Sequence, residues 1–243
     1  MSCLPASRLR ELFDGVRLIF PLLLGTIPFA ILYGSLAIDA GLTPAQAQGM
    51  SLLVFAGAAQ FVAVTLLTGG ASAAVLLSTT LVINLRHLLY SAALQPHVRH
   101  LRSRWRMLLA FWLTDEAFAV AQQRYARVDA SPYKHWFFMG AAMAMYLNWQ
   151  AFTLAGILFG QRVPNLADWG LDFAMLATFI GIVVPMLRNR PSLAAALVAG
   201  SVSLACQELP YQLGLLVAAL AGIASAVLLE RHGGQRLSGE GAQ

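Results

Sequence analysis

A cluster of polar residues interrupts a long apolar run in the middle of this chain. The stretch NLRHLLYS at residues 84–91 carries Asn84, Arg86 and His87 within four positions. At helical spacing Asn84 and His87 share one face, and Arg86 and Tyr90 share an adjacent one. Two explanations stay open. The stripe is a helix end whose side chains reach the lipid headgroups, or it lines a path for a substrate or for protons.

A second cluster, LTDEAFA at residues 113–119, carries two adjacent carboxylates. Charges inside a membrane span are costly and usually paired, so we expect Asp115 or Glu116 to pair with Arg86. The other carboxylate then stays available. A carboxylate buried beside another one holds a proton more readily, which a proton-coupled carrier requires. The alternative is that both carboxylates only neutralise the arginine.

Two further stretches disturb an apolar run without adding charge, and they are VFAGAAQF at 54–61 and GTIPFAILYG at 25–34. Gln60 brings an amide into the first, and Gly57 leaves the backbone unshielded. This pattern fits either a tight helix crossing or a broken helix whose backbone meets a small ligand. Pro28 removes a backbone donor and frees a carbonyl group one turn earlier, which indicates a packing kink or a part of the path.

The amino-acid composition indicates that these stretches lie in a lipid bilayer. The 243 residues are 58% hydrophobic and 11% charged, with a mean hydropathy of +0.67, whereas soluble domains are about 25% charged. Several apolar segments approach the roughly 20 residues that cross a bilayer as a helix. The sequence predicts an all-α, polytopic membrane helix bundle of about seven to eight hydrophobic segments, at 18–38, 49–68, 71–94, 107–121, 135–160, 171–187, 192–207 and 211–229.

The chain divides into three expected parts. Residues 1–17 predict an interfacial N-terminal helix with Glu11 on its polar surface. Residues 18–230 predict a single transmembrane transport domain, and the Gly-rich residues 231–243 predict a disordered polar tail. Thr43, with Pro44 and Gln46 after it, predicts a capped helix start.

Basic residues give the expected topology and one conflict. The positive-inside rule places the N-terminus and residues 124–134 in the cytoplasm. The loop PHVRHLRSRWR, residues 96–106, carries four arginines, yet eight full spans place it outside. Either the rule fails once here, or the neighbouring segments do not both cross. Segment 107–121 is short and polar, so it is a candidate for a broken or re-entrant helix.

Several function classes find no support in the sequence. Motifs of metalloproteases, serine hydrolases and P-loop proteins are missing, and no His or Cys spacing suits a metal. We therefore expect no enzyme, no cofactor and no metal site. The net charge of +5 fits arginines that flank membrane spans, rather than nucleic-acid binding.

The ordered set VFAGAAQF, NLRHLLYS and LTDEAFA, with GTIPFAILYGSLAIDAGL before it and LDFAMLATFIGIVVPMLRNRPSLAAALVAG after it, resembles the AzlC family. The resemblance covers about residues 15–230. It implies the large subunit of a two-component bacterial exporter of branched-chain amino acids in the cytoplasmic (inner) membrane, with a small AzlD-type membrane protein as partner.

The resemblance makes Asn84, Arg86, His87, Tyr90, Asp115, Glu116, Gly57 and Gln60 family-motif residues here. For this chain we expect a proton-coupled exporter. Arg86 orders the site or meets the substrate carboxylate, Asp115 or Glu116 carries the proton, and Asn84 and Gln60 hydrogen-bond the zwitterion. The alternative is a structural or assembly subunit, in which the buried charges only hold helices together or seat a partner.

Overall fold

The computed structural model is α-helical throughout the part of the chain that it describes, which is residues 7–129, 131–162, 173, 176–177, 180–181, 183–184, 187–207, 209 and 213–240. The helices are α1 (Arg8–Asp39), α2 (Pro44–Leu53), α3 (Gly57–Thr68), α4 (Ala73–Val98), α5 (Ser103–Phe111), α6 (Asp115–Ala126), α7 (Lys134–Phe159), the short 3₁₀ turn η1 (Gly160–Arg162), α9 (Arg190–Ala205) and α10 (Leu213–Glu240).

Three of the described helices, α1, α4 and α7, are long and apolar enough to cross a membrane. Shorter apolar helices accompany them, so the predicted α-helical fold is confirmed for the described residues, and the length and composition of its helices are consistent with a membrane protein. The predicted span at 171–187 lies largely outside the described residues, and the number of spans stays a prediction. Helix α1 begins at Arg8 and continues without a break to Asp39. Helix α10 extends to Glu240. The interfacial helix expected at residues 1–17 and the disordered tail expected at 231–243 remain predictions.

The chain forms two compact units, and each has its own packing. The first contains residues 1–71 and 84–179, and the second contains residues 72–83 and 180–243. In the second unit α9 packs on α10. Asn189 caps α9, and a proline follows in its first turn. Whether the two units make up one transport domain, as expected for 18–230, stays a prediction.

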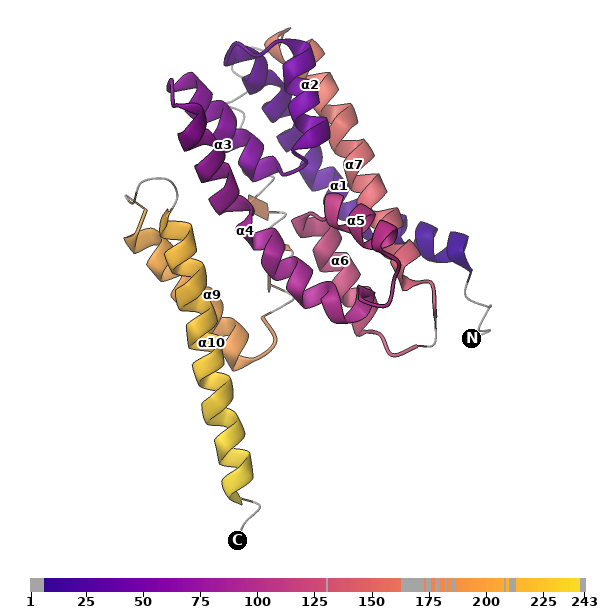
Figure 1. Cartoon of the computed structure of the whole chain (residues 1–243), viewed down its shortest axis with the longest axis vertical. Helices are drawn as coiled ribbons and strands as arrows, with labels where there is room; N and C mark the ends of the chain where they lie inside the picture. The colour runs from indigo at the N-terminus through magenta and orange to yellow at the C-terminus, as the bar shows by residue number, and fades with distance from the viewer. Residues whose placement is uncertain are drawn as a thin grey trace. The chain divides into compact units, whose positions relative to one another are not determined.

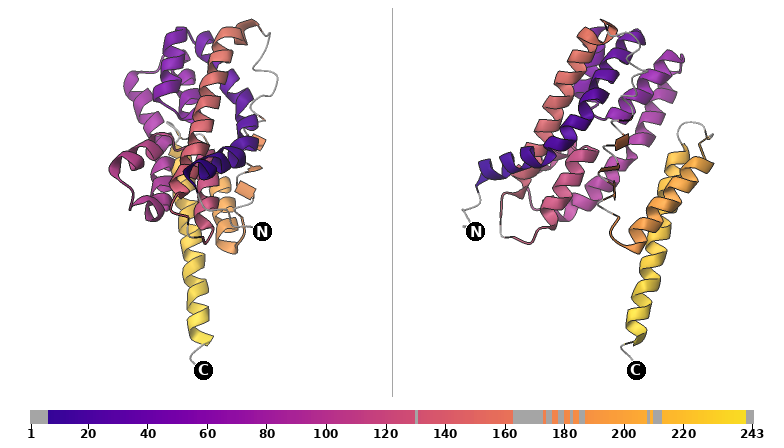
Figure 2. Two further views of the ribbon diagram at one scale, coloured as in Figure 1. Left: turned by 90° about the vertical axis from the view of Figure 1, so that its right-hand side faces the viewer. Right: turned by 180° about the vertical axis from the view of Figure 1, so that it is seen from behind.

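Helices α1 and α7 form the centre of the first unit and lie side by side in every view (Figures 1 and 2). Glycines permit this close contact. A Cβ atom at Gly15 would clash with the carbonyl oxygen of Phe137, and one at Gly34 would clash with that of Thr153. The contacts follow the same order along both helices, so α1 and α7 run in the same direction.

Helices α2 and α3 are two halves of a broken helix. Thr43 accepts from Gln46 N in a full capping box with proline in the first turn, as predicted. The helix ends at Leu53, three residues are not helical, and α3 begins at Gly57. Phe61 of α3 packs on Tyr33 of α1, whose hydroxyl donates to Ala47 O of α2. The two halves therefore lie against the same part of α1, and the chain doubles back.

Helices α5 and α6 form a second broken pair, again with three non-helical residues between them. Trp105 near the start of α5 packs on Trp136 near the start of α7, and Tyr125 near the end of α6 stacks on His97 near the end of α4. Both ends of the pair thus lie at one end of the unit. At 9 residues, α5 is roughly 14 Å long, about half the hydrocarbon thickness. The prediction of a broken helix here is confirmed.

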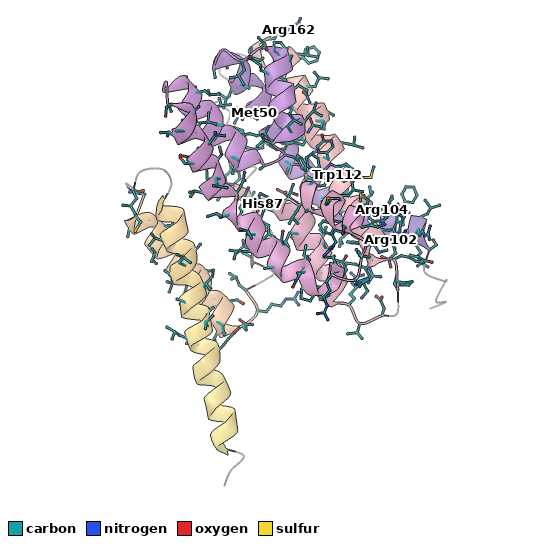
Figure 3. The ribbon with its side chains drawn as sticks, viewed as in Figure 1. Met50, His87, Arg102, Arg104, Trp112 and Arg162 are labelled. Carbon is teal, nitrogen blue, oxygen red and sulfur yellow. The ribbon has the colours of Figure 1, made fainter. Side chains whose placement is uncertain are left out.

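This arrangement resolves the conflict over the basic loop. The loop lies beside the starts of α1 and α7, because Arg8 sits over the rings of Tyr133 and Trp136 and Trp105 contacts His135. Arg102 and Arg104 lie at this end of the unit, whereas Arg162 lies at the other (Figure 3). We call this the basic end. Because α5 and α6 start and end at this same end of the unit, the positive-inside rule need not fail.

A buried charge network ties the basic end together. Arg124 of α6 donates to both carboxylate oxygens of Glu11, with Nε 2.9 Å from Oε2, and its Nη1 lies 2.6 Å from Asp129 Oδ2. Glu11 is 6% exposed, so its expected place on a polar surface is wrong. The Arg124 guanidinium lowers the pKa of the Asp129 carboxyl to about 2. The network joins three parts of the chain: α1, α6 and the loop before α7.

Candidate functional site

Arg86 and Asp115 form an ion pair inside the first unit. Arg86 Nη1 lies 2.9 Å from Asp115 Oδ2, and the two side chains are 25% and 11% exposed. Tyr90 donates its hydroxyl hydrogen to the other carboxylate oxygen, with 2.5 Å between Tyr90 Oη and Asp115 Oδ1. The sequence predicts that Asp115 or Glu116 pairs with Arg86, and the structure shows that Asp115 does.

The local structure explains how these three side chains meet. Arg86 and Tyr90 lie one turn apart on α4, so they face the same way. Asp115 is the first residue of α6, where Thr114 caps the helix by accepting from Ala117 N at 3.2 Å. The positive end of the helix dipole stabilises a carboxylate at this position. Phe118 stacks on Tyr90 with 4.4 Å between ring centroids, which fixes the phenol against α6.

A cavity of about 40 Å³ lies beside the ion pair. Its polar wall consists of Arg86, Thr114, Asp115 and Glu116, and the remaining wall consists of Thr26, Phe29, Phe55, Gly57, Ala58, Met145 and Trp149. We call it the central cavity. Both helix breaks reach it, because Gly57 and Ala58 begin α3 and Asp115 and Glu116 begin α6. The N-termini of α3 and α6 therefore meet at one buried place.

Trp149 lines the central cavity next to the break before α3. Its Nε1 donates to Gln60 Oε1 at 3.0 Å, and its ring packs on Phe29. A Cβ atom at position 57 would lie 3.0 Å from Trp149 Cη2. Gly57 therefore lets the indole approach the backbone, and Gln60 orients it. These contacts support the broken-helix interpretation of residues 54–61.

The predicted site residues separate into those that line the cavity, those that support it and those that lie apart. Arg86, Asp115, Glu116 and Gly57 line it. Tyr90 and Gln60 hold residues that line it. The others are not part of its wall: His87 Nδ1 lies 3.2 Å from the Asn84 carbonyl oxygen on the same helix, and Pro28 lies inside α1. Their roles in a pathway stay predictions.

The sequence prediction misses the apolar wall, above all Met145 and Trp149. Aromatic and methionine residues in a span resemble ordinary packing residues, so composition does not distinguish them. One signal was present in the polar residues that flank Trp149. Asn148 donates to Leu23 O at 3.3 Å, and Gln150 accepts from Gln48 Nε2 at 2.7 Å. Polar residues at consecutive positions of a span indicate buried contacts on more than one face.

Several buried polar atoms near the helix breaks have no hydrogen-bond partner among the described residues. They include Arg86 Nε, Gln60 Nε2 and Trp112 Nε1. Buried polar groups are nearly always hydrogen-bonded, so each such donor needs water or a solute. All three atoms are donors, which suits an acceptor such as a carboxylate or a water chain.

These features define a class of protein. Long apolar helices with two broken pairs that meet at a buried, charged cavity make an α-helical membrane protein. Broken helices whose termini face a buried site are the construction by which many membrane transporters hold small solutes.

Comparison with known proteins gives the family. The family model described as AzlC protein matches residues 21–163, and the chain belongs to the AzlC family. The matched region includes both broken helix pairs and every residue of the central cavity.

Three relatives represent the range of similarity. The branched-chain amino acid transport protein AzlC of Bacillus subtilis is 32% identical over 164 residues, or 68% of this chain and 63% of that one. The inner membrane protein YgaZ of Escherichia coli is 29% identical over 92% of this chain and 91% of that one. An uncharacterised membrane protein of Archaeoglobus fulgidus is 34% identical over 84% and 88%. No solved structure matches the chain significantly.

Proposed function

We propose that this chain is a membrane transporter that exports branched-chain amino acids through the central cavity, coupled to protons. One observation carries the proposal. A paired arginine and carboxylate, with a second carboxylate beside them, lie where two broken helices meet. Buried charge is costly in a membrane and marks solute or proton paths. The name of the Bacillus subtilis relative supports the substrate class.

The charges of the cavity suit a zwitterion. Helix α3 has no side-chain cap, so the N–H groups of its first turn lack helical partners and face an anion favourably. Gly57 and Ala58, which begin this helix, line the cavity, and we assign the substrate carboxylate to them. Asp115 and Glu116 on the other helix start then face the substrate ammonium group.

The apolar wall suits an aliphatic side chain. Phe29, Phe55, Met145 and Trp149 surround the part of the cavity away from the charges. A water molecule needs at least about 10–15 Å³ by the same measure, so 40 Å³ holds a few waters and is too small for leucine. We infer that the two broken pairs separate from each other to admit substrate.

The coupling proton is assigned to the carboxylate pair. One arginine faces two adjacent carboxylates, so a single positive charge compensates only one of them. Among the described residues Asp115 forms the ion pair with Arg86, and Glu116 forms none. Glu116 is therefore the first candidate for the proton. Proton entry would then drive substrate exit, because ammonium and proton compete for the same negative charge.

The cellular setting follows from the same resemblance. We propose a multi-pass protein of the bacterial inner membrane, as the name of the Escherichia coli relative suggests. We further propose a small AzlD-type membrane subunit as partner. A short neighbouring reading frame that encodes an apolar chain, and co-purification of its product, would support this partner.

Transport in proteoliposomes tests the function. Vesicles that hold this chain with its small partner should carry leucine, isoleucine or valine in response to a pH gradient, whereas glutamate should not move. Glu116→Gln should remove the response to the gradient in protein that remains folded. If branched-chain amino acids do not move under any gradient, the structural-subunit alternative replaces the proposal.

A further inference from the structure

A second cavity at the basic end has different chemistry from the first. It has a volume of about 320 Å³ and is lined by Pro96, His97, His100, Leu101, Tyr125, Asp129, Ser131, Pro132, Lys134 and His135. We call it the basic cleft. It lies in the first unit, and it shares no lining residue with the central cavity. Its size is that of a small-molecule site, and transport as described above makes no use of it.

The lining offers several hydrogen-bond donors. Three imidazoles surround the cleft, each with at least one N–H group in any protonation state. Lys134 begins α7, whose start has no side-chain cap, so the N–H groups of Lys134 and His135 lack helical partners. The hydroxyl of Tyr125 is buried and has no hydrogen-bond partner within the described part of the chain, while its ring stacks on His97 at 4.9 Å. Together these groups suit an oxyanion.

The charge around the cleft is also positive. Arg99, Arg102, Arg104 and Arg106 belong to the loop that forms one wall or to the helix after it, and none of them forms an ion pair within the described part of the chain. Of the described residues in the lining, Asp129 alone carries a carboxylate, and it is paired with Arg124 at 2.6 Å and with Lys134 at 3.5 Å. Its charge is therefore compensated, while the four arginines lie outside the lining and add positive charge near the cleft.

We propose that the basic cleft binds a phosphate group, carried by an anionic phospholipid or by a soluble phosphoester. The positive-inside rule places this end at the cytoplasmic leaflet. That leaflet displays anionic headgroups, which basic pockets between membrane helices bind. A headgroup phosphate held there would contact α4, α6 and the start of α7 at once, and it would brace the loop between α4 and α5.

Lipid binding to the full-length purified protein tests the proposal. Native mass spectrometry should show phosphatidylglycerol retained by the unchanged protein. Lys134→Gln and His100→Gln should each weaken this binding about tenfold, since one hydrogen bond to a charged group contributes roughly that factor. The matched control is Arg17→Gln, which removes a positive charge from a side chain that is 83% exposed and outside the cleft. It should leave binding unchanged.

A second arm distinguishes the two sources of phosphate. Glycerol 3-phosphate, measured by calorimetry, presents the same group without acyl chains. If only this ligand loses affinity in Lys134→Gln and His100→Gln, a soluble phosphoester is the source. His100 is exposed, so its replacement should leave the melting temperature unchanged and keep the test clear of folding defects. If neither ligand depends on these residues, or Arg17→Gln weakens binding equally, the proposal is overturned.

Discussion

The ion pair between Arg86 and Asp115 gives the most detailed prediction. Asp115→Asn removes a carboxylate that is 11% exposed and leaves a guanidinium that is 25% exposed without its counter-charge. Removing one partner of a fully buried pair costs about 3–5 kcal/mol. Because a quarter of the Arg86 side chain stays exposed, we expect about 2–3 kcal/mol here. For a chain of this size that corresponds to a fall in melting temperature of about 5–10 °C.

The double variant Arg86→Gln with Asp115→Asn separates stability from transport. Neither side chain then carries a buried charge, so the free energy of unfolding should return to within about 1 kcal/mol of that of the unchanged protein. Transport should stay at background, because Asp115 no longer offers a negative charge to the substrate ammonium group. A control is Arg10→Gln with Asp14→Asn. That pair is exposed and 3.9 Å apart, and surface pairs of this kind contribute about 0–1 kcal/mol.

Melting in detergent and leucine flux in proteoliposomes are the two readouts. If the double variant recovers transport as well as stability, the pair only holds α4 against α6. If Asp115→Asn alone changes neither readout, the energetic argument is wrong, because the remaining buried charge must then find another partner at no cost.

Three further outcomes follow from the structure. Gly57→Val should lower flux and cost about 1–3 kcal/mol, because its side chain would meet Trp149, 3.0 Å from the Cβ position; unchanged melting and flux would refute the tight contact. Arg124→Gln should cost about 3–5 kcal/mol, since its side chain is 9% exposed and pairs with two carboxylates; a melting shift below 2 °C would contradict the network. In a chain without its native cysteines, an impermeant thiol reagent should reach Ser103→Cys from the cytoplasmic side and Asp39→Cys from the opposite side; labelling of both from one side would refute the doubling back of α2 and α3.

The charged part of the site was predictable because membrane insertion penalises charge. Arg86 inside an apolar run requires a partner, and Asp115 and Glu116 were the carboxylates in the neighbouring spans. The break between α5 and α6 was predictable for a similar reason, since residues 107–121 are too short and polar to cross. The capping pattern of Thr43, Pro44 and Gln46 likewise predicted where α2 begins.

Other parts were beyond sequence reasoning. The break before Gly57 contains Val54 and Phe55, which carry no turn chemistry, so a tight crossing fitted the pattern equally well. Trp149 looks like any packing residue until Gln60 is found beside it. Glu11 has the sequence context of a surface residue, and its burial depends on Arg124, more than a hundred positions away. Contacts between distant segments decide such cases, and local patterns do not contain them.

Accessibility of the central cavity tests the account most directly. Ala58 lines this cavity, and Ala58→Cys in a chain without its native cysteines adds a single small thiol there. Our account predicts that a small thiol reagent modifies this cysteine and abolishes flux, and that leucine, but not glutamate, slows the modification. A cysteine that reacts at the same rate with and without leucine, or whose modification leaves flux intact, would show that substrate does not pass between the two broken helices.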